Sequence, residues 1–163
     1  RSRGLGDVYK RQALSRTLIR TYAADYPDRP DLALRAANGR ILADTQADLF
    51  VTVFYGILSP DSASLTYCNA GHHPPYLLNF RNGDTPHPLP GRGMALGIVH
   101  DTHWGHSTVA LPPGAALLLY TDGVLDAQNS TEDRFGTQQM LDAAQAGLRA
   151  GRSPQADILN RAA

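Results

Sequence analysis

Apolar residues recur at helical spacing in two segments of the N-terminal third of the chain. In residues 13–24 they lie four positions apart, at Leu14, Leu18 and Tyr22. In residues 31–44 the stripe consists of Leu34, Ala37, Ile41 and Leu42. Positions three or four apart share one face of a helix, so the pattern predicts two helices that pack on a core. Pro30 and Asp31 are typical start signals for the second.

After residue 48 the pattern changes to short segments rich in β-branched and aromatic residues, separated by turn residues, which is typical of β-strands. Strands are predicted at residues 49–58, 65–70, 76–80, 107–111 and 115–121. Asn82-Gly83 predicts a tight hairpin turn. Helical character returns at residues 137–150 and again after Pro154.

This order of elements predicts an α+β fold: two helices, five or six mostly antiparallel strands, and further helices. The chain has 163 residues, 42% of them hydrophobic, which is enough for one domain or a large piece of one. The first 12 residues, RSRGLGDVYKRQ, are unlike the rest and resemble translated adaptor sequence. We therefore predict that residues 1–12 are non-native and that the native sequence comprises residues 13–163.

Charge and cysteine content exclude several classes of function. Fifteen basic residues balance fifteen acidic ones, so the chain lacks the field that attracts nucleic acid or an anionic membrane. Its longest apolar runs are about half of the roughly 18 residues that span a bilayer, so no membrane insertion is predicted. Cys68 is the single cysteine. It permits neither an intrachain disulfide nor a cysteine-cluster metal site, and it is expected to be a small buried residue of a cytoplasmic protein.

The sharpest local feature is the run Leu117–Val124, in which an apolar strand leads into Asp122 and Gly123. A carboxylate held at the end of a strand is a suitable ligand for Mg²⁺ or Mn²⁺, because these ions prefer oxygen donors. The alternative is an ordinary Asp-Gly turn, which is the commoner role of this dipeptide.

Four segments together resemble the SpoIIE-type branch of the PPM (2C-type) metal-dependent protein phosphatases. They are FVTVFYGIL at 50–58, LTYCNAGHHPP at 65–75, LGI at 96–98 and LYTDGV at 119–124, in the order and approximate spacing of that family. The resemblance implies a four-layered α-β-β-α sandwich that holds two Mn²⁺ or Mg²⁺ ions between mainly antiparallel sheets. It also implies that Asp122 is a metal ligand, that Gly123 shapes the turn, and that a metal-bound water attacks the phosphorus directly.

Other ligand motifs of the family are absent from this chain. These are an early glycine-glycine-aspartate element, an aspartate-valine-x-glycine-x-glycine element before the first helix, and a late aspartate-aspartate strand. Gly6-Asp7-Val8 matches only the start of the second, so Asp7 is taken as a coincidence. One carboxylate cannot hold two divalent ions with useful affinity. We therefore expect a fragment of the sandwich, a partial domain that is inactive alone, and we assign no catalytic acid or base.

Asn69 and His72, within NAGHHPP, have two interpretations. They could orient a substrate or a catalytic loop. Alternatively, Gly71 and the prolines shape a hairpin while Asn69 caps backbone groups, and this second interpretation is favoured.

His100, His103 and His106 suggest a zinc site by their residue type alone. In a strand, however, residues three apart face opposite sides, so a solvated strand edge is favoured over convergence on a metal. Asp126 is either a supporting residue near Asp122 or, more commonly, a solvated loop carboxylate. Phe135 is expected to pack in the core at the start of the last helix.

The resemblance implies a phosphatase that removes phosphate from serine or threonine of a bacterial regulatory protein, such as an anti-sigma-factor antagonist. Such domains usually follow a sensor or receiver domain in the parent protein. The alternative is a degenerate PPM fold that serves as a non-catalytic regulatory or binding module. A histidine-based zinc protein is a third, weaker hypothesis.

Overall fold

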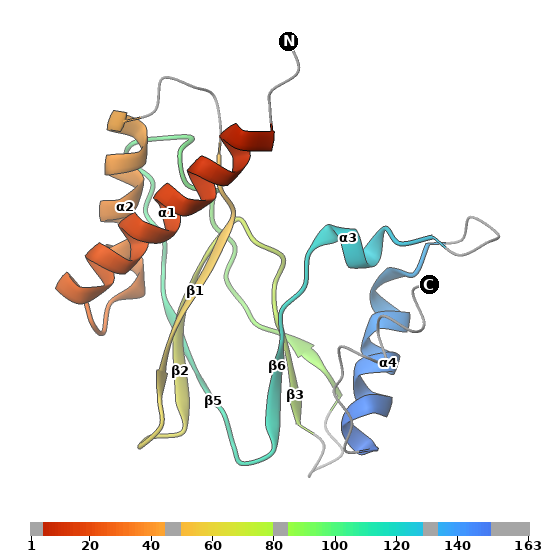
Figure 1. The fold of residues 1–163 in the computed structure, drawn as a ribbon. Helices are drawn as coiled ribbons and strands as arrows, with labels where there is room; N and C mark the ends of the chain where they lie inside the picture. The colour runs from red at the N-terminus through yellow and green to blue at the C-terminus, as the bar shows by residue number, and fades with distance from the viewer. Residues whose placement is uncertain (1–4, 45–49, 80–84, 129–133, 151–163) are drawn as a thin grey trace. The chain divides into compact units, whose positions relative to one another are not determined.

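The computed structural model describes residues 5–44, 50–79, 85–128 and 134–150 (Figure 1). The chain divides into two compact units. Unit 1 comprises Arg1–His72 and Pro90–Leu111, and unit 2 comprises His73–Leu89 and Pro112–Ala163. Each unit contains one three-stranded sheet and is described by itself.

Unit 1 begins with the two helices that the apolar spacing predicts, α1 (Leu5–Asp25) and α2 (Pro30–Asp44). Pro30 suits the first helical position because it has no N–H to leave unpaired there. In the predicted stripe of α2, Leu34 and Ala37 are fully inaccessible, Ile41 is 3% exposed and Leu42 is half-buried. Helix α1 extends further towards the N-terminus than residues 13–24, since it begins at Leu5.

The sheet of unit 1 contains β1 (Val53–Ser59), β2 (Ser64–Ala70) and β5 (Ser107–Ala110), in the order β1-β2-β5. Both pairs of strands are antiparallel. A turn closed by the Ala63 N–H and the Pro60 carbonyl joins β1 to β2, as the sequence predicts. Helix α2 packs on β2, and the core between them consists of Leu34, Ile41, Cys68, Ala70, Leu96 and Trp104.

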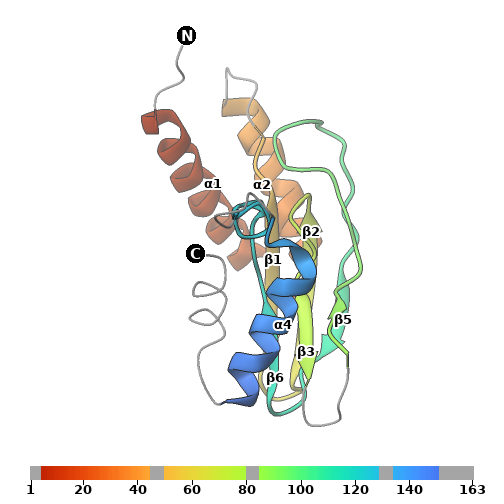
Figure 2. The same ribbon diagram turned by 90° about the vertical axis from the view of Figure 1, so that its right-hand side faces the viewer.

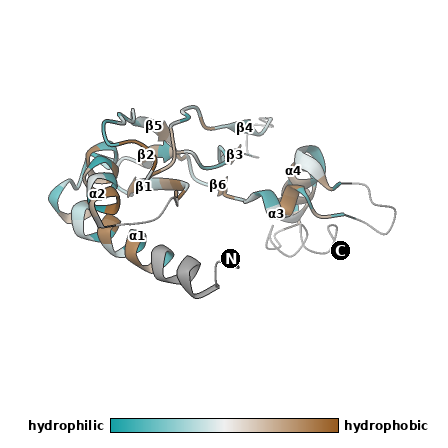
Figure 3. Ribbon diagram, turned by 90° about the horizontal axis from the view of Figure 1, so that it is seen from above, coloured by the Kyte–Doolittle hydropathy of each residue, from teal (hydrophilic) through white to brown (hydrophobic). Residues whose placement is uncertain are grey.

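Unit 2 contains a second antiparallel sheet, formed by β3 (Tyr76–Asn79), β4 (His87–Pro88) and β6 (Ala115–Leu118) in the order β4-β3-β6. A short helix α3 (Asp122–Leu125) and a longer α4 (Gly136–Arg149) follow. Brown apolar and teal polar residues both occur on α4 in Figure 3. Its apolar side packs on the sheet, and the core there consists of Leu78, Leu118, Phe135, Met140, Leu141, Ala143 and Ala144.

Several predicted boundaries need correction. The first strand begins at Val53 rather than at residue 49, and β6 ends at Leu118 rather than at residue 121. Strands that are neighbours in the sequence do not all pair with each other, because β5 pairs with β2 and β6 pairs with β3. The short strand β4, which contains His87, was not among the predicted strands. The predicted Asn82-Gly83 turn and the helix after Pro154 lie outside the described residues.

No helix in the described ranges has the length and apolar character needed to cross a membrane. Within the part of the chain that the structure describes, six strands and four helices (Figure 2) confirm a mixed α+β fold with antiparallel sheets.

Candidate functional site

Asp122 is the first residue of α3 and is exposed. One of its carboxylate oxygens, Oδ1, accepts a hydrogen bond from the Gly123 N–H at 2.9 Å. Three residues separate it from the end of β6, so the carboxylate starts a helical turn rather than ending a strand directly. The other oxygen, Oδ2, and the remaining lone pair of Oδ1 are available to a ligand.

Aromatic packing fixes the segment that carries Asp122. Leu118 pairs with Tyr76 across the sheet, which sets the register of the strand. Two residues further on, Tyr120 lies 6.1 Å from the ring of Tyr76 and 5.5 Å from that of His73, measured between ring centroids. Val124 packs against the apolar core of unit 2. The backbone around Asp122 is therefore supported on both sides, as a metal ligand requires.

The donor chemistry of Asp122 fits a hard divalent ion, since the carboxylate is exposed and only one oxygen has a backbone partner. Within the described ranges, however, no group of three or more His, Cys, Asp or Glu side chains gathers in one place. These residues do not by themselves make up a dinuclear centre, so Asp122 remains a predicted ligand.

Asp126 lies at the end of α3 and is exposed. Its Oδ1 is 3.2 Å from Arg134 Nη1, and both side chains are more than half exposed. This geometry agrees with a solvated carboxylate. Phe135, the next residue after Arg134, is 5% exposed and belongs to the core of unit 2, which confirms its predicted packing role.

Asn69 stabilises the turn that follows β2. Its Oδ1 accepts a hydrogen bond from the His72 N–H at 2.8 Å, and its Nδ2 donates to the His72 carbonyl at 3.0 Å. Gly71 has φ +77°, and a Cβ there would lie 3.0 Å from the backbone nitrogen of Ala95. Both observations confirm the structural interpretation of NAGHHPP, in which Asn69 caps backbone groups and Gly71 permits the turn.

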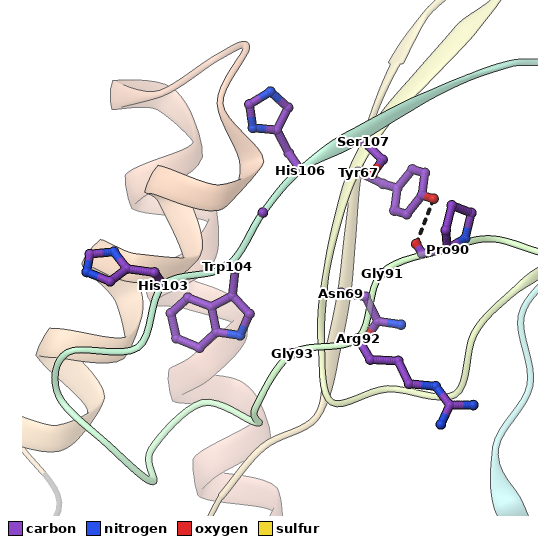
Figure 4. A pocket seen from close by; sticks show the side chains of 11 residues that line it. Tyr67, Asn69, Pro90, Gly91, Arg92, Gly93, His103, Trp104, His106 and Ser107 are labelled. Atoms are coloured by element: carbon purple, nitrogen blue, oxygen red, sulfur yellow. Dashed lines mark hydrogen bonds between the residues drawn. The ribbon is translucent and has the colours of Figure 1, made fainter.

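The three histidines do not converge on a metal. His100 and His103 lie in an irregular connection, and His106 directly precedes β5, so the prediction of a strand edge across this segment is wrong. Figure 4 shows the imidazoles of His103 and His106 pointing in different directions. Instead, His106 Nδ1 lies 3.0 Å from Asp31 Oδ1 at the start of α2.

Asp31 is a buried carboxylate that sequence patterning identified only as a helix start signal. Arg29 donates to both of its oxygens, from Nε at 3.0 Å and from Nη2 at 2.8 Å. The hydrogen bond from Arg29 is the main cause that lowers the pKa of Asp31, against the opposing effect of burial. Burial, and secondarily the Asp31 charge, raises the pKa of Cys68 to about 12, so the thiol is not a reactive nucleophile.

Asn38 is a second residue whose role the sequence did not reveal. It is fully buried on α2. Its Nδ2 donates to the Val99 carbonyl at 2.9 Å, and its Oδ1 accepts from the Gly97 N–H at 2.7 Å. The available signal was its position, since an asparagine between Leu34 and Ile41 lies on the apolar face of the predicted helix.

These contacts fasten residues 90–106, which we call the strap, onto the rest of unit 1. Leu96 exchanges two backbone hydrogen bonds with Val51, at 2.9 and 3.0 Å. The Tyr67 hydroxyl of β2 donates to the Pro90 carbonyl at 2.8 Å, and within the strap Trp104 Nε1 donates to the Met94 carbonyl at 2.7 Å. The strap has little regular structure of its own, so its position depends on these side chains.

A pocket of about 230 Å³ opens between the two ends of the strap (Figure 4). Tyr67 and Asn69 of β2 line it, together with Ser107 of β5. The remaining lining residues belong to the strap: Pro90, Gly91, Arg92, Gly93, His103, Trp104, Gly105 and His106. No pattern in the sequence predicted this pocket, because its walls are far apart along the chain.

Comparison with known proteins places the chain among phosphatase domains. Protein IcfG of Synechocystis is 33% identical over 119 residues, which cover 72% of this chain and 18% of IcfG. Phosphoserine phosphatase RsbU of Bacillus subtilis is 28% identical over 126 residues, which cover 76% of this chain and 37% of RsbU. The chain thus spans well under half of the length of these curated relatives.

Solved structures share the fold. The RsbU and RsbW domains of a Mycobacterium tuberculosis protein match with a TM-score of 0.68 at 24% identity, over 91% of this chain and 40% of that one. The SiaA-PP2C domain of Pseudomonas aeruginosa also gives 0.68, at 20% identity, over 90% of this chain and 56% of that one.

These structures confirm the predicted fold class, a part of a PP2C-type domain. The family model for stage II sporulation protein E (SpoIIE) matches residues 12–161. The chain therefore belongs to the SpoIIE family of PP2C-type phosphatase domains.

Proposed function

We propose that this chain is part of the catalytic domain of a metal-dependent protein phosphatase that acts on phosphoserine or phosphothreonine in the bacterial cytoplasm. The observation that carries the proposal is the family match over residues 12–161, which includes the Tyr120-Thr121-Asp122-Gly123 motif. The names of two relatives support the reaction, because RsbU and RsbP of Bacillus subtilis are both phosphoserine phosphatases.

The proposed substrate is a phosphorylated regulatory protein such as an anti-sigma-factor antagonist, and a sensor or receiver domain is expected upstream in the parent. The similarity to RsbU and RsbP supports this class of substrate. The balanced charge of the chain agrees with a protein partner rather than a nucleic acid.

In this proposal Asp122 binds one of two Mn²⁺ or Mg²⁺ ions. Such ions neutralise phosphoryl oxygens and lower the pKa of a bound water. The chain's own contribution is to hold the Asp122 carboxylate on a backbone fixed by Tyr120 and the β6–β3 register. Asp122 is the one ligand motif of the family that this sequence matches, so we expect the isolated chain to have little or no activity.

The test uses the full-length parent and a phosphorylated regulatory protein as substrate. We expect phosphate release with Mn²⁺ or Mg²⁺, loss of release on chelation, and loss of turnover in Asp122→Asn. The matched control is Asp126→Asn, which removes an exposed carboxylate from the same short helix and should retain activity. Circular dichroism should show that both variants are folded.

Two results would contradict the proposal. Turnover at the wild-type rate by Asp122→Asn would remove Asp122 from the metal site. A parent that binds the regulatory protein but releases no phosphate with either metal would instead support a non-catalytic PPM-fold module.

A further inference from the structure

Residues 90–93, Pro-Gly-Arg-Gly, form one wall of the pocket in unit 1. Gly91 has φ +98°, a backbone conformation that favours glycine. Gly91 and Gly93 have no side chains, so they line the pocket with backbone atoms. Gly93 also has no room for a side chain, since a Cβ there would overlap the Trp104 ring and lie 2.7 Å from the Asn69 carbonyl oxygen.

The backbone N–H groups of this loop have no acceptor among the residues that the structure describes. Within the described ranges, those of Gly91, Arg92 and Gly93 make no hydrogen bond, whereas those of Leu96 and Gly97 further along the strap are both paired. Successive unpaired N–H groups in a glycine-containing turn are a common means of binding anions in proteins.

The electrostatic character of the lining also favours an anion. Its lining residues include Arg92, His103 and His106 and no aspartate or glutamate, although the two imidazoles point away from the glycine loop in Figure 4. The Asp31 carboxylate contacts His106 but also accepts two hydrogen bonds from Arg29. Its charge is therefore largely compensated.

We propose that this pocket binds a small tetrahedral oxyanion, as presented by inorganic phosphate or by a phosphorylated side chain. The N–H groups of Gly91–Gly93 would donate to the oxygens. Arg92 is exposed and extends outward in Figure 4, so its guanidinium can turn towards a bound anion. A volume of about 230 Å³, against about 30 Å³ for a water, leaves room for a phosphoryl group and part of the residue that carries it.

This site is independent of the proposed metal centre, because none of its residues is a predicted metal ligand. The test is therefore made in EDTA, so that failure of the oxyanion site and failure of the phosphatase proposal are distinguishable. Trp104 is the only tryptophan of the chain and lines the pocket, which makes its fluorescence a local reporter.

Titration with inorganic phosphate at constant ionic strength should change Trp104 fluorescence with saturation. In ¹⁵N-resolved spectra it should also shift the amide protons of Gly91 and Gly93. Arg92→Gln should weaken binding by about tenfold, the effect of losing one charge-assisted hydrogen bond. The control Arg20→Gln removes an exposed arginine of α1 that does not line the pocket, and should leave the affinity unchanged.

A second titration with O-phosphoserine distinguishes the sources of the oxyanion. Tighter binding than that of phosphate would assign the pocket to a phosphorylated residue, and equal binding would assign it to free phosphate. Absence of saturable changes at Trp104, Gly91 and Gly93, or equal affinities in Arg92→Gln and Arg20→Gln, would overturn the proposal.

Discussion

In unit 2 a helix with an apolar side covers a small sheet, whereas in unit 1 an irregular strap is held in place by buried polar side chains. The core of unit 2 joins β3 and β6 to α4 through apolar residues such as Leu78 and Met140. Unit 1 has an apolar core as well, but the buried side chains of Asn38 and Tyr67 also donate to backbone carbonyls of the strap.

This difference shows two ways of holding a segment of the chain in place. Apolar packing is non-directional and tolerates small shifts. Hydrogen bonds from buried side chains specify distance and angle, and leaving one unmade is costly. The strap, which has little regular structure, is therefore placed as specifically as a strand would be. The following experiments test this comparison, beginning with the largest expected effect.

Met140→Ala should produce the largest loss of stability. Met140 is fully buried in the core of unit 2, and the substitution leaves a cavity. We expect the free energy of unfolding to fall by about 2–5 kcal/mol. Urea denaturation followed by circular dichroism measures it. The neighbouring Gln139→Ala, an exposed position on the same helix, should stay within about 0.5 kcal/mol of the wild type.

Asn38→Ala should destabilise unit 1 by a smaller amount, about 1–3 kcal/mol, because it leaves the half-buried Gly97 N–H without an acceptor. The Val99 carbonyl is less affected, since the Thr102 hydroxyl also donates to it at 3.1 Å. Urea denaturation followed by Trp104 fluorescence gives the cost, and amide hydrogen exchange at Gly97 locates it.

The control for Asn38→Ala is Arg35→Ala, which truncates an exposed residue of the same helix. Equal losses of unfolding free energy in the two variants would contradict the comparison between the units, because the strap would then be held by apolar packing alone.

Asp31→Asn should have the smallest effect, one that depends on pH. The folded-state pKa of Asp31 is lowered, chiefly by its hydrogen bond with Arg29. The carboxylate therefore contributes stability above its unfolded pKa of about 4, and this contribution is lost as the pH falls through the lower folded value. Partial exposure of Arg29 keeps the contribution small.

The measurement is the urea midpoint, recorded by Trp104 fluorescence near neutral pH and again at a pH below about 4. The wild type should lose more stability on acidification than Asp31→Asn does. Asp28→Asn, an exposed aspartate just before α2, should behave as the wild type does. An equal acid-induced loss in all three proteins would show that Asp31 does not help to fasten the start of α2.

Much of the fold was predictable because it depends on local periodicity. The stripe of α2, the strand at 65–70 and the helix at 137–150 each carry a repeat that matches one secondary structure. The end of β6 was misplaced because Leu119 and Tyr120 continue the strand-like composition after the pairing with β3 has stopped. Strand pairing depends on two segments of the chain, whereas local composition describes only one of them.

Some residues of the candidate site could likewise be identified from the local sequence, and others could not. Asp122 was identified by the motif around it and remains a predicted metal ligand. The structural role of Asn69 was favoured correctly, because its two hydrogen bonds join residues only three positions apart. Asn38 reaches the strap across 59 and 61 positions, a separation that no sequence window covers.

The sequence by itself determined the helices, most of the strands, the α+β class and the membership of a phosphatase family, since these depend on periodicity and contiguous motifs. Only the tertiary structure decided that the strap is fastened by Asn38, Tyr67 and Asp31, and that Gly91–Gly93 line a pocket. The physical reason is that hydrogen bonds and pockets require particular atoms from distant segments to meet at about 3 Å, and only folding of the chain brings them together.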